Sequence, residues 1–250
     1  MNLAIIAAGE GSRLKAEGVP GSKPLVSIGG VPMIERLISH AAACGIRRYC
    51  CIVNEDSADL KEFLLSRKLP LDGRVVVRST PSSMHSLFAL APMLRDGPFC
   101  LATADAIFRE AEFRAYLEAA AARRDSDGVL AITGYIHDEK PLCVQLDDSG
   151  RIVAFSDSAE GCRWATGGLY YFSPRIFDCM EEALRSGTTR LRNFLRLLLQ
   201  RSYRLHGFAF SKIVDVDHVG DIADAEELLE AELTHPRGAS PGIPPRRPGA

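Results

Sequence analysis

One stretch decides the fold, Leu3-Ala-Ile-Ile-Ala-Ala-Gly-Glu-Gly-Ser-Arg-Leu14, together with Gly21-Ser-Lys-Pro-Leu25 shortly after it. Its apolar start, residues 3–8, predicts a buried strand. Gly9 and Gly11 then allow the backbone to turn sharply and to approach a ligand, because glycine carries no Cβ. A strand that leads into a glycine-rich loop is typical of the place where open α/β sheets bind nucleotides.

The loop also carries two cations, Arg13 and Lys23, which suit phosphate oxygens. Its spacing excludes two better-known phosphate loops. The dinucleotide-binding fingerprint requires a third glycine where this chain has Leu14. The P-loop requires glycine before the lysine and Ser or Thr after it, where this chain has Ser22 and Pro24. The stretch predicts a phosphate cradle of another kind, with an ordinary glycine-rich turn as the alternative.

Apolar periodicity after this loop predicts an alternation of helices and strands. Helices are expected over 32–43 and 56–67, and strands over 48–53 and 74–78. Such an alternation requires right-handed crossovers between parallel strands. We therefore predict a doubly wound, Rossmann-like α/β fold, with a mixed, mostly parallel sheet and helices on both faces.

The pattern changes in the second half of the chain. A β-hairpin is predicted from 141–146 and 151–155, because the intervening Asp147-Asp-Ser-Gly150 is a strong turn sequence. Two helices, 173–184 and 189–200, are expected after it.

These patterns predict one domain over residues 1–233. Residues 1–123 would be its nucleotide-binding half, and residues 124–233 its acceptor-binding half with the small hairpin. Residues 234–250 are rich in Pro, Gly and Arg and are predicted to form a disordered tail.

Composition bounds the partners and the compartment. The 250 residues are 46% hydrophobic and 25% charged, as is usual for a globular protein. A net charge of −2 gives no reason to expect nucleic acid as a partner, and the apolar runs are too short to span a membrane. Seven cysteines, Cys143 among them, include no Cys-x-x-Cys pair. They predict reduced core residues of a cytoplasmic protein, and neither a zinc site nor a disulfide framework.

Two further patches carry carboxylates. The apolar run 99–104 predicts a strand that ends at Asp105, on the same carboxyl edge of the sheet as the cradle. Asp215 and Asp217 are separated by one residue, so alternation along a strand would put both on one face. Carboxylates suit a hard cation such as Mg²⁺. Helix capping is the alternative for Asp105, although the next predicted helix, 110–123, begins several residues later.

The first loop matches the pattern Gly-x-Gly-x-Arg-Leu, a short variable loop, then Lys-Pro. The matching residues are Gly9, Gly11, Arg13, Leu14, Lys23 and Pro24. This pattern resembles the motif of the nucleotidyltransferases that join a nucleoside triphosphate to a phosphorylated small molecule. That family includes the sugar-1-phosphate nucleotidyltransferases, the choline-phosphate and inositol-phosphate cytidylyltransferases, and the molybdenum-cofactor nucleotidyltransferases. The resemblance runs from residue 1 to about residue 233.

The resemblance implies an activity. A nucleotidyl group would pass from a nucleoside triphosphate, CTP or UTP, to a sugar, polyol or amino-alcohol phosphate, and pyrophosphate would leave. Arg13 would bind the β- and γ-phosphates, and Lys23 would neutralise the α-phosphate and the incoming phosphate. Asp105 and Asp217 would hold Mg²⁺ as a cofactor.

The resemblance also implies two binding sets. The nucleotide-binding set is Ala7, Ala8, Gly9, Gly11, Ser12, Ser82, Ser83, His85, Ser86 and Thr103. The acceptor-binding set is Trp164, Gly167 and Gly168. Simpler interpretations stay open beside these: Ser82 or Ser83 as a helix N-cap, the two glycines as a β-bulge, and Trp164 as a core residue.

Two rival functions remain. A molybdenum-cofactor enzyme is disfavoured by the long acceptor half, residues 128–172. A non-catalytic nucleotide-binding module would be expected to lack one of four residues that are all present, namely Arg13, Lys23, Asp105 and Asp217. The base, the acceptor and the oligomeric state, with a homodimer as one option, stay open. So does the role of Arg192, as a phosphate ligand or as a solvated helix charge.

Overall fold

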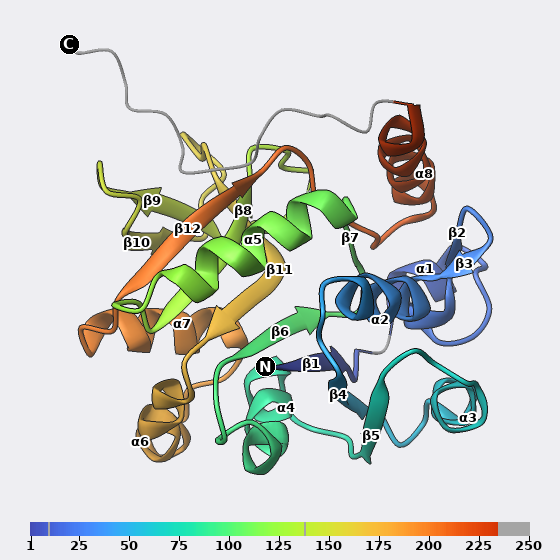
Figure 1. Cartoon of the computed structure of the whole chain (residues 1–250), viewed down its shortest axis with the longest axis horizontal. Coiled ribbons are helices and arrows are strands. Elements are labelled where there is room, and N and C mark those ends of the chain that lie inside the picture. Colours follow the sequence, from blue (N-terminus) through green and yellow to red (C-terminus); the bar gives the residue numbers. More distant parts are fainter. Residues whose placement is uncertain (10, 138, 235–250) are drawn as a thin grey trace.

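The computed structural model describes residues 1–9, 11–137 and 139–234. Within these ranges the chain forms a nine-stranded mixed sheet (Figure 1). Its parallel part has the order β6-β1-β4-β5. The bounds are Asn2–Ala7 for β1, Arg48–Val53 for β4, Asp72–Val77 for β5 and Phe99–Thr103 for β6. The predicted α/β fold is therefore confirmed.

The acceptor half continues the same sheet. Strand β11 (Ala165–Phe172) runs antiparallel to β6 on one side and to β8 (Gly128–Thr133) on the other. Strand β12 (Leu205–Phe210) is parallel to β8. The predicted hairpin is also confirmed, as β9 (Cys143–Leu146) and β10 (Ile152–Ser156). Both predicted halves thus share one sheet.

Helices cover both faces of the sheet, since successive side chains of β1 point to opposite sides. Leu3 and Ile5 pack in one cluster, with α2 (Met33–Ala43), α3 (Ala58–Ser66) and α5 (Glu110–Ala122). Ala4 and Ile6 pack in the other cluster. Its helices are α4 (Ser83–Leu90), α6 (Met180–Arg185) and α7 (Leu191–Gln200).

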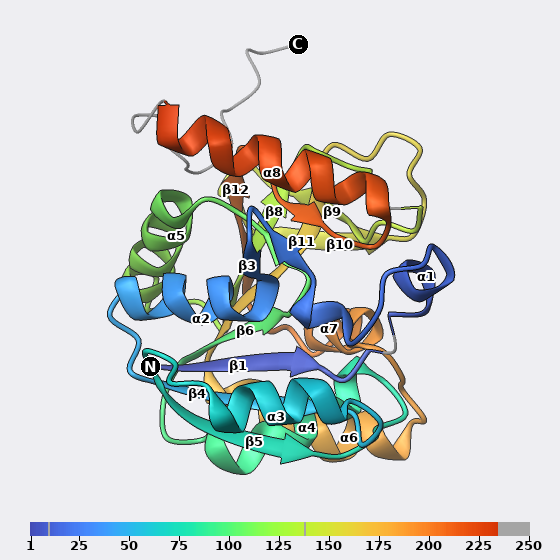
Figure 2. The same ribbon diagram turned by 90° about the vertical axis from the view of Figure 1, so that its right-hand side faces the viewer.

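A third apolar cluster lies at the carboxyl edge of the parallel strands. It joins α1 (Ser12–Ala16) and the hairpin β2–β3 (Ser27–Ile28 and Val31–Pro32) to the last helix, α8 (Val219–Thr234). Figure 2 shows α8 lying above this hairpin. Leu14, Ile28 and Leu228 are among its buried residues. This cluster brings α1 and α8, which are far apart in the sequence, together around the first loop.

Several short elements were not predicted from the sequence. They include β7 (Ala106–Ile107), which pairs with β13 (Val214–Asp215), and the 3-10 turns η1 (Lys23–Leu25) and η2 (Ala91–Met93). The helix predicted over 173–184 is divided into η3 (Pro174–Cys179) and α6. Of the predicted tail, Thr234 ends α8 and residues 235–250 lie outside the described residues. Among the described residues, no helix is both long and apolar enough to cross a membrane.

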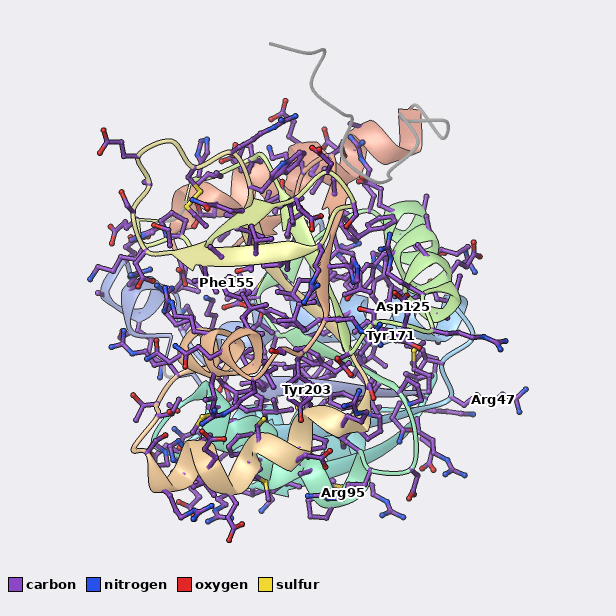
Figure 3. The ribbon with its side chains drawn as sticks, turned by 90° about the vertical axis from the view of Figure 1, so that its left-hand side faces the viewer. Arg47, Arg95, Asp125, Phe155, Tyr171 and Tyr203 are labelled. Atoms are coloured by element: carbon purple, nitrogen blue, oxygen red, sulfur yellow. A yellow bond between two sulfur atoms is a disulfide. The ribbon has the colours of Figure 1, made fainter. Side chains whose placement is uncertain are left out.

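The prediction that all cysteines are reduced is wrong. Cys143, at the start of β9, forms a disulfide with Cys162 in the loop before β11 (Figure 3). The two residues are 19 positions apart, and strand register makes them neighbours, because Ala165 of β11 pairs with Cys143. Cysteine spacing alone does not reveal such a register. The other cysteines of the described chain are free, namely Cys44, Cys50, Cys51, Cys100 and Cys179.

The disulfide predicts a thiol count and a stability difference. Five thiols should titrate in denaturant before reduction and seven after it. Cys162→Ser should lower the free energy of unfolding by about 3 kcal/mol, because the unfolded chain loses the closed loop. Urea unfolding of both proteins checks this, and with reductant present they should unfold at the same urea concentration. Seven titrating thiols in the unreduced protein would contradict the bond.

Candidate functional site

The three sequence patches meet at one point. The Lys23 ammonium donates to Asp105 Oδ2 and to Asp217 Oδ1, at 2.6 Å each. Arg13 donates to the other oxygen of Asp217 at 2.7 Å. These four residues come from the first loop, from the end of β6 and from the segment after β13. The structure therefore assembles the predicted catalytic and metal-binding residues into one ion-pair network.

The pairing of β13 with β7 brings the carboxylates of Asp105 and Asp217 together. Asp215 lies opposite Ala106, and the Val216 N–H donates to the Asp105 carbonyl at 3.1 Å. The strand ends there, since the Asp217 N–H donates to the Asp215 carbonyl in a tight turn. We predicted that Asp215 and Asp217 lie on one face of a strand. That prediction is wrong, because the strand ends at Asp215 and Asp217 lies outside it.

Two local features hold Lys23 in place. Gly11 has φ +60°, and a Cβ at that position would lie 2.8 Å from Lys23 Cβ. Glycine is therefore required both by the backbone and by the packing of Lys23. On the other side of the lysine, Asp59 of α3 accepts from the Ser22 N–H at 2.7 Å and from Ser22 Oγ at 2.5 Å. Asp59 was not predicted as a site residue, because no local pattern in the sequence connects it to this loop.

The charges of the network are strongly coupled. Burial by itself would lower the pKa of Lys23, but the charge of Asp105 and the hydrogen bonds to Asp105 and Asp217 outweigh burial and raise it. Burial would raise the pKa of Asp105, but the nearby Lys23 charge and hydrogen bond lower it. Lys23 therefore stays cationic, and Asp105 anionic, at neutral pH.

A second pair of contacts fixes the segment that carries Asp217. Asp221, the third residue of α8, accepts from the Asp217 and His218 N–H groups, as in half of a capping box. Asp221 therefore places a negative charge in the first turn of α8 and binds the backbone just before the helix. Glu17, after α1, pairs with His218 Nδ1 at 2.5 Å and accepts from the Val219 N–H. Glu17, which the sequence analysis missed, thus joins the Arg13 loop to the Asp217 segment.

A pocket opens beside Arg13 and Asp217, against β8 and β11. Its lining includes Tyr135, Glu139, Pro141, Thr166 and Asp215. Glu139 Oε2 lies 3.5 Å from the Arg13 guanidinium across the pocket.

Tyr135 in this pocket is already engaged. It donates to Asp224 at 2.9 Å, stacks on His137, and has Lys212 Nζ 4.3 Å from its ring centroid. The Tyr135 ring is therefore already in contact with its neighbours and is not open to a cationic ligand.

The predicted acceptor residues are not all brought to this pocket. Gly167 lines it, but a Cβ there would overlap the side chain of Ile213. Gly168 has φ +73°, and a Cβ there would overlap Thr103 Oγ1. Both lie where the register of β11 against β8 shifts, so the bulge interpretation holds. Trp164 lies in a different cavity, beside the disulfide and under the Arg163 guanidinium.

The predicted nucleotide loop lies at the carboxyl ends of β1 and β6. Ala7 ends β1 and Thr103 ends β6, while Ala8 and Gly9 follow β1 and Ser12 begins α1. A Cβ on Gly9 would meet no atom of the described residues within 4 Å. The space beside Gly9 is therefore open, and nucleotide binding there stays a prediction.

The predicted base-contacting hydroxyls are engaged within the protein. Ser82 Oγ and Ser83 Oγ accept from the backbone N–H groups of Arg190 and Leu191, at 3.0 Å each. These serines cap the neighbouring helix α7, and Ser82, at the N-cap position of α4, makes no side-chain cap bond to α4 itself.

The remaining predicted base contacts lie on the same turn. Ser82 Oγ and His85 Nδ1 share a hydrogen bond of 2.9 Å. Ser86 Oγ shares a 2.6 Å bond with Thr80 Oγ1. Direct readout of a base by these residues stays a prediction.

Curated relatives support the sequence resemblance. A 2-aminoethylphosphonate cytidylyltransferase of Lancefieldella rimae is 28% identical over 176 residues, which are 69% of this chain and 67% of that protein. A mannose-1-phosphate guanylyltransferase of Mycobacterium tuberculosis is 23% identical over 241 residues, which are 95% of this chain and 65% of that protein. The alignments thus span about two thirds of the length of these relatives.

The fold is shared with a solved structure, the inositol-1-phosphate CTP transferase from T. maritima. The TM-score is 0.78 at 18% identity, over 92% of this chain and 96% of that chain. The profile of the Nucleotidyl transferase family matches residues 3–232, which include the cradle and all four residues of the ion-pair network. The chain belongs to the nucleotidyl transferase family.

Proposed function

We propose that the protein transfers a nucleotidyl group from a nucleoside triphosphate to a phosphorylated or phosphonylated small molecule and releases pyrophosphate. The observation that carries this proposal is the Lys23 ammonium between Asp105 and Asp217, with Arg13 beside it, at the end of a glycine-rich cradle. CTP is the first triphosphate to test and UTP the second, because two of the similar proteins are named as a cytidylyltransferase and a CTP transferase.

The reaction needs alignment and charge neutralisation rather than proton transfer. A phosphate monoester is largely dianionic near neutral pH, since its second pKa is about 6. Its oxygen forms a bond to the α-phosphorus while the bond from that phosphorus to the bridging oxygen of the leaving pyrophosphate breaks. Lys23 would neutralise the α-phosphate and the incoming oxygen, and Arg13 would bind the leaving pyrophosphate.

Asp105 and Asp217 fit a Mg²⁺ ion. Both carboxylates contact the same ammonium nitrogen, so they converge on one small volume. No group of three or more His, Cys, Asp or Glu that could hold a metal is found among the described residues. Mg²⁺ is commonly held in enzymes by one or two carboxylates plus substrate phosphates and water. When bound, it would neutralise charge on the phosphates.

The compartment and the assembly stay predictions. A cytoplasmic location was expected from the cysteine pattern, but disulfides are rare in compartments that keep thiols reduced, and the Cys143–Cys162 bond weighs against it. A homodimer likewise remains an expectation.

The test of the function is pyrophosphate release with Mg²⁺, from each of four nucleoside triphosphates against sugar 1-phosphates, polyol phosphates and amino-alcohol phosphates or phosphonates. We expect release only with one triphosphate and one acceptor class together, and none after chelation of Mg²⁺. Tight triphosphate binding without turnover of any acceptor would favour the non-catalytic binding module.

Loss of the Lys23 charge should reduce turnover severely. Lys23→Ala is expected to lower kcat by about 100- to 1,000-fold, as removal of one preorganised charge-stabilising group does. The matched control is Lys61→Ala on the exposed side of α3, which should keep wild-type activity. Circular dichroism would check that both variants are folded, and near-normal turnover by folded Lys23→Ala would refute the site assignment.

The pH profile should report the acceptor and not Lys23. With a phosphate-monoester acceptor, kcat/KM should rise as the phosphate becomes dianionic near pH 6, and then stay level to about pH 9. Because the pKa of Lys23 is raised above its ordinary value of 10.5, the lysine keeps its charge throughout this range. A loss of activity between about pH 7 and about pH 9, with the fold intact, would contradict a cationic Lys23.

A further inference from the structure

Helix α7 contacts both sides of the proposed site. At its start, the N–H groups of Arg190 and Leu191 are bound by Ser82 and Ser83, next to the predicted base. In its first turns, Arg192 and Arg196 point to the acceptor half and both pair with Asp157, at 2.8 and 2.7 Å. Asp157 directly follows β10. Figure 3 shows Phe155, two residues before it, on the side of β10 that packs against α7.

Arg192 makes a contact that Arg196 does not share. Its second guanidinium nitrogen donates to the Lys140 carbonyl at 2.9 Å. Lys140 lies between Glu139 and Pro141, which both line the pocket beside Arg13. We call residues 139–142 the wall segment.

The wall segment is held at its other end by β11 and by the disulfide. The Leu142 carbonyl accepts from the Thr166 N–H at 3.0 Å, and Cys143, the next residue, is bonded to Cys162. Cys162 lies in the loop that Asp157 begins, residues 157–164 between β10 and β11. The contacts therefore form a closed ring, from Arg192 through the wall segment and the disulfide to Asp157 and back to Arg192.

We propose that Arg192 is a positioning residue that holds the wall segment against β11, so that the pocket lined by both keeps the shape which the acceptor requires. This inference rests on the proposed function. A guanidinium suits the task, because its planar fork can bind a carboxylate and a carbonyl at the same time. The sequence left two interpretations of Arg192 open, phosphate ligand or solvated helix charge. The contacts point to neither, since both terminal guanidinium nitrogens, Nη1 and Nη2, donate within the protein.

The kinetic test compares Arg192→Ala with Arg196→Ala. The two arginines lie on one helix, share Asp157 and are similarly exposed, 28% and 25%, so Arg196→Ala is a matched control. Arg192→Ala should raise KM for the acceptor about tenfold, as expected for loss of a charge-assisted hydrogen bond, while KM for the triphosphate stays within twofold. Arg192→Lys can replace one of the two hydrogen bonds, so its KM for the acceptor should lie between those of Arg192→Ala and Arg196→Ala. Equal acceptor KM values for Arg192→Ala and Arg196→Ala would overturn the proposal.

Hydrogen exchange on the full chain gives a readout that needs no substrate. In Arg192→Ala, the amides of residues 139–146 other than Pro141, and that of Thr166, whose N–H donates to the wall segment, should exchange faster than in the wild type and in Arg196→Ala. Unchanged exchange there would overturn the proposed positioning. If the wild type turns over no acceptor at all, the proposed function fails, and exchange still decides whether Arg192 holds the wall segment.

Discussion

The site depends on one interaction, the Lys23 ammonium between the carboxylates of Asp105 and Asp217. Without a cation between them, two carboxylates so close together would repel each other, and the Lys23 side chain that separates them is only 11% exposed. The interaction also joins three chain segments that are remote in sequence. It places a fixed positive charge where a triphosphate would bring negative charge.

The fold supplies this interaction by bringing strand ends to one edge. Strands β1 and β6 are adjacent and parallel, so the cradle and Asp105 emerge side by side. Antiparallel pairing of β13 with β7 then adds the segment of Asp217 from the far end of the chain. Asp59 and Gly11 fix the backbone around Lys23. Each support is a short contact between segments, so the charged groups need little rearrangement to meet a substrate.

The acceptor side is built differently, because the wall segment is held by contacts that lie outside the pocket. Arg192 and the disulfide hold the segment that faces Arg13, and Tyr135 is engaged by its own neighbours. Under the proposed function, the chemistry at the phosphates and the choice of acceptor would be carried by separate groups of residues. The names of the similar proteins are consistent with such a separation, since they share nucleotidyl transfer but differ in the acceptor.

The parts of the fold that depend on near neighbours in the chain were predictable from the sequence. The apolar period of β1, the glycine spacing before Arg13, the hairpin turn at 147–150 and the single carboxylate that ends the run at Asp105 were all predicted correctly. Tertiary structure alone decided the Cys143–Cys162 bond, the two serines of α4 that cap α7, and the bulge that explains the β11 glycines. These features arise from the register between strands and from the docking of helices. Local periodicity carries no information about either, because both are set by how the whole core packs.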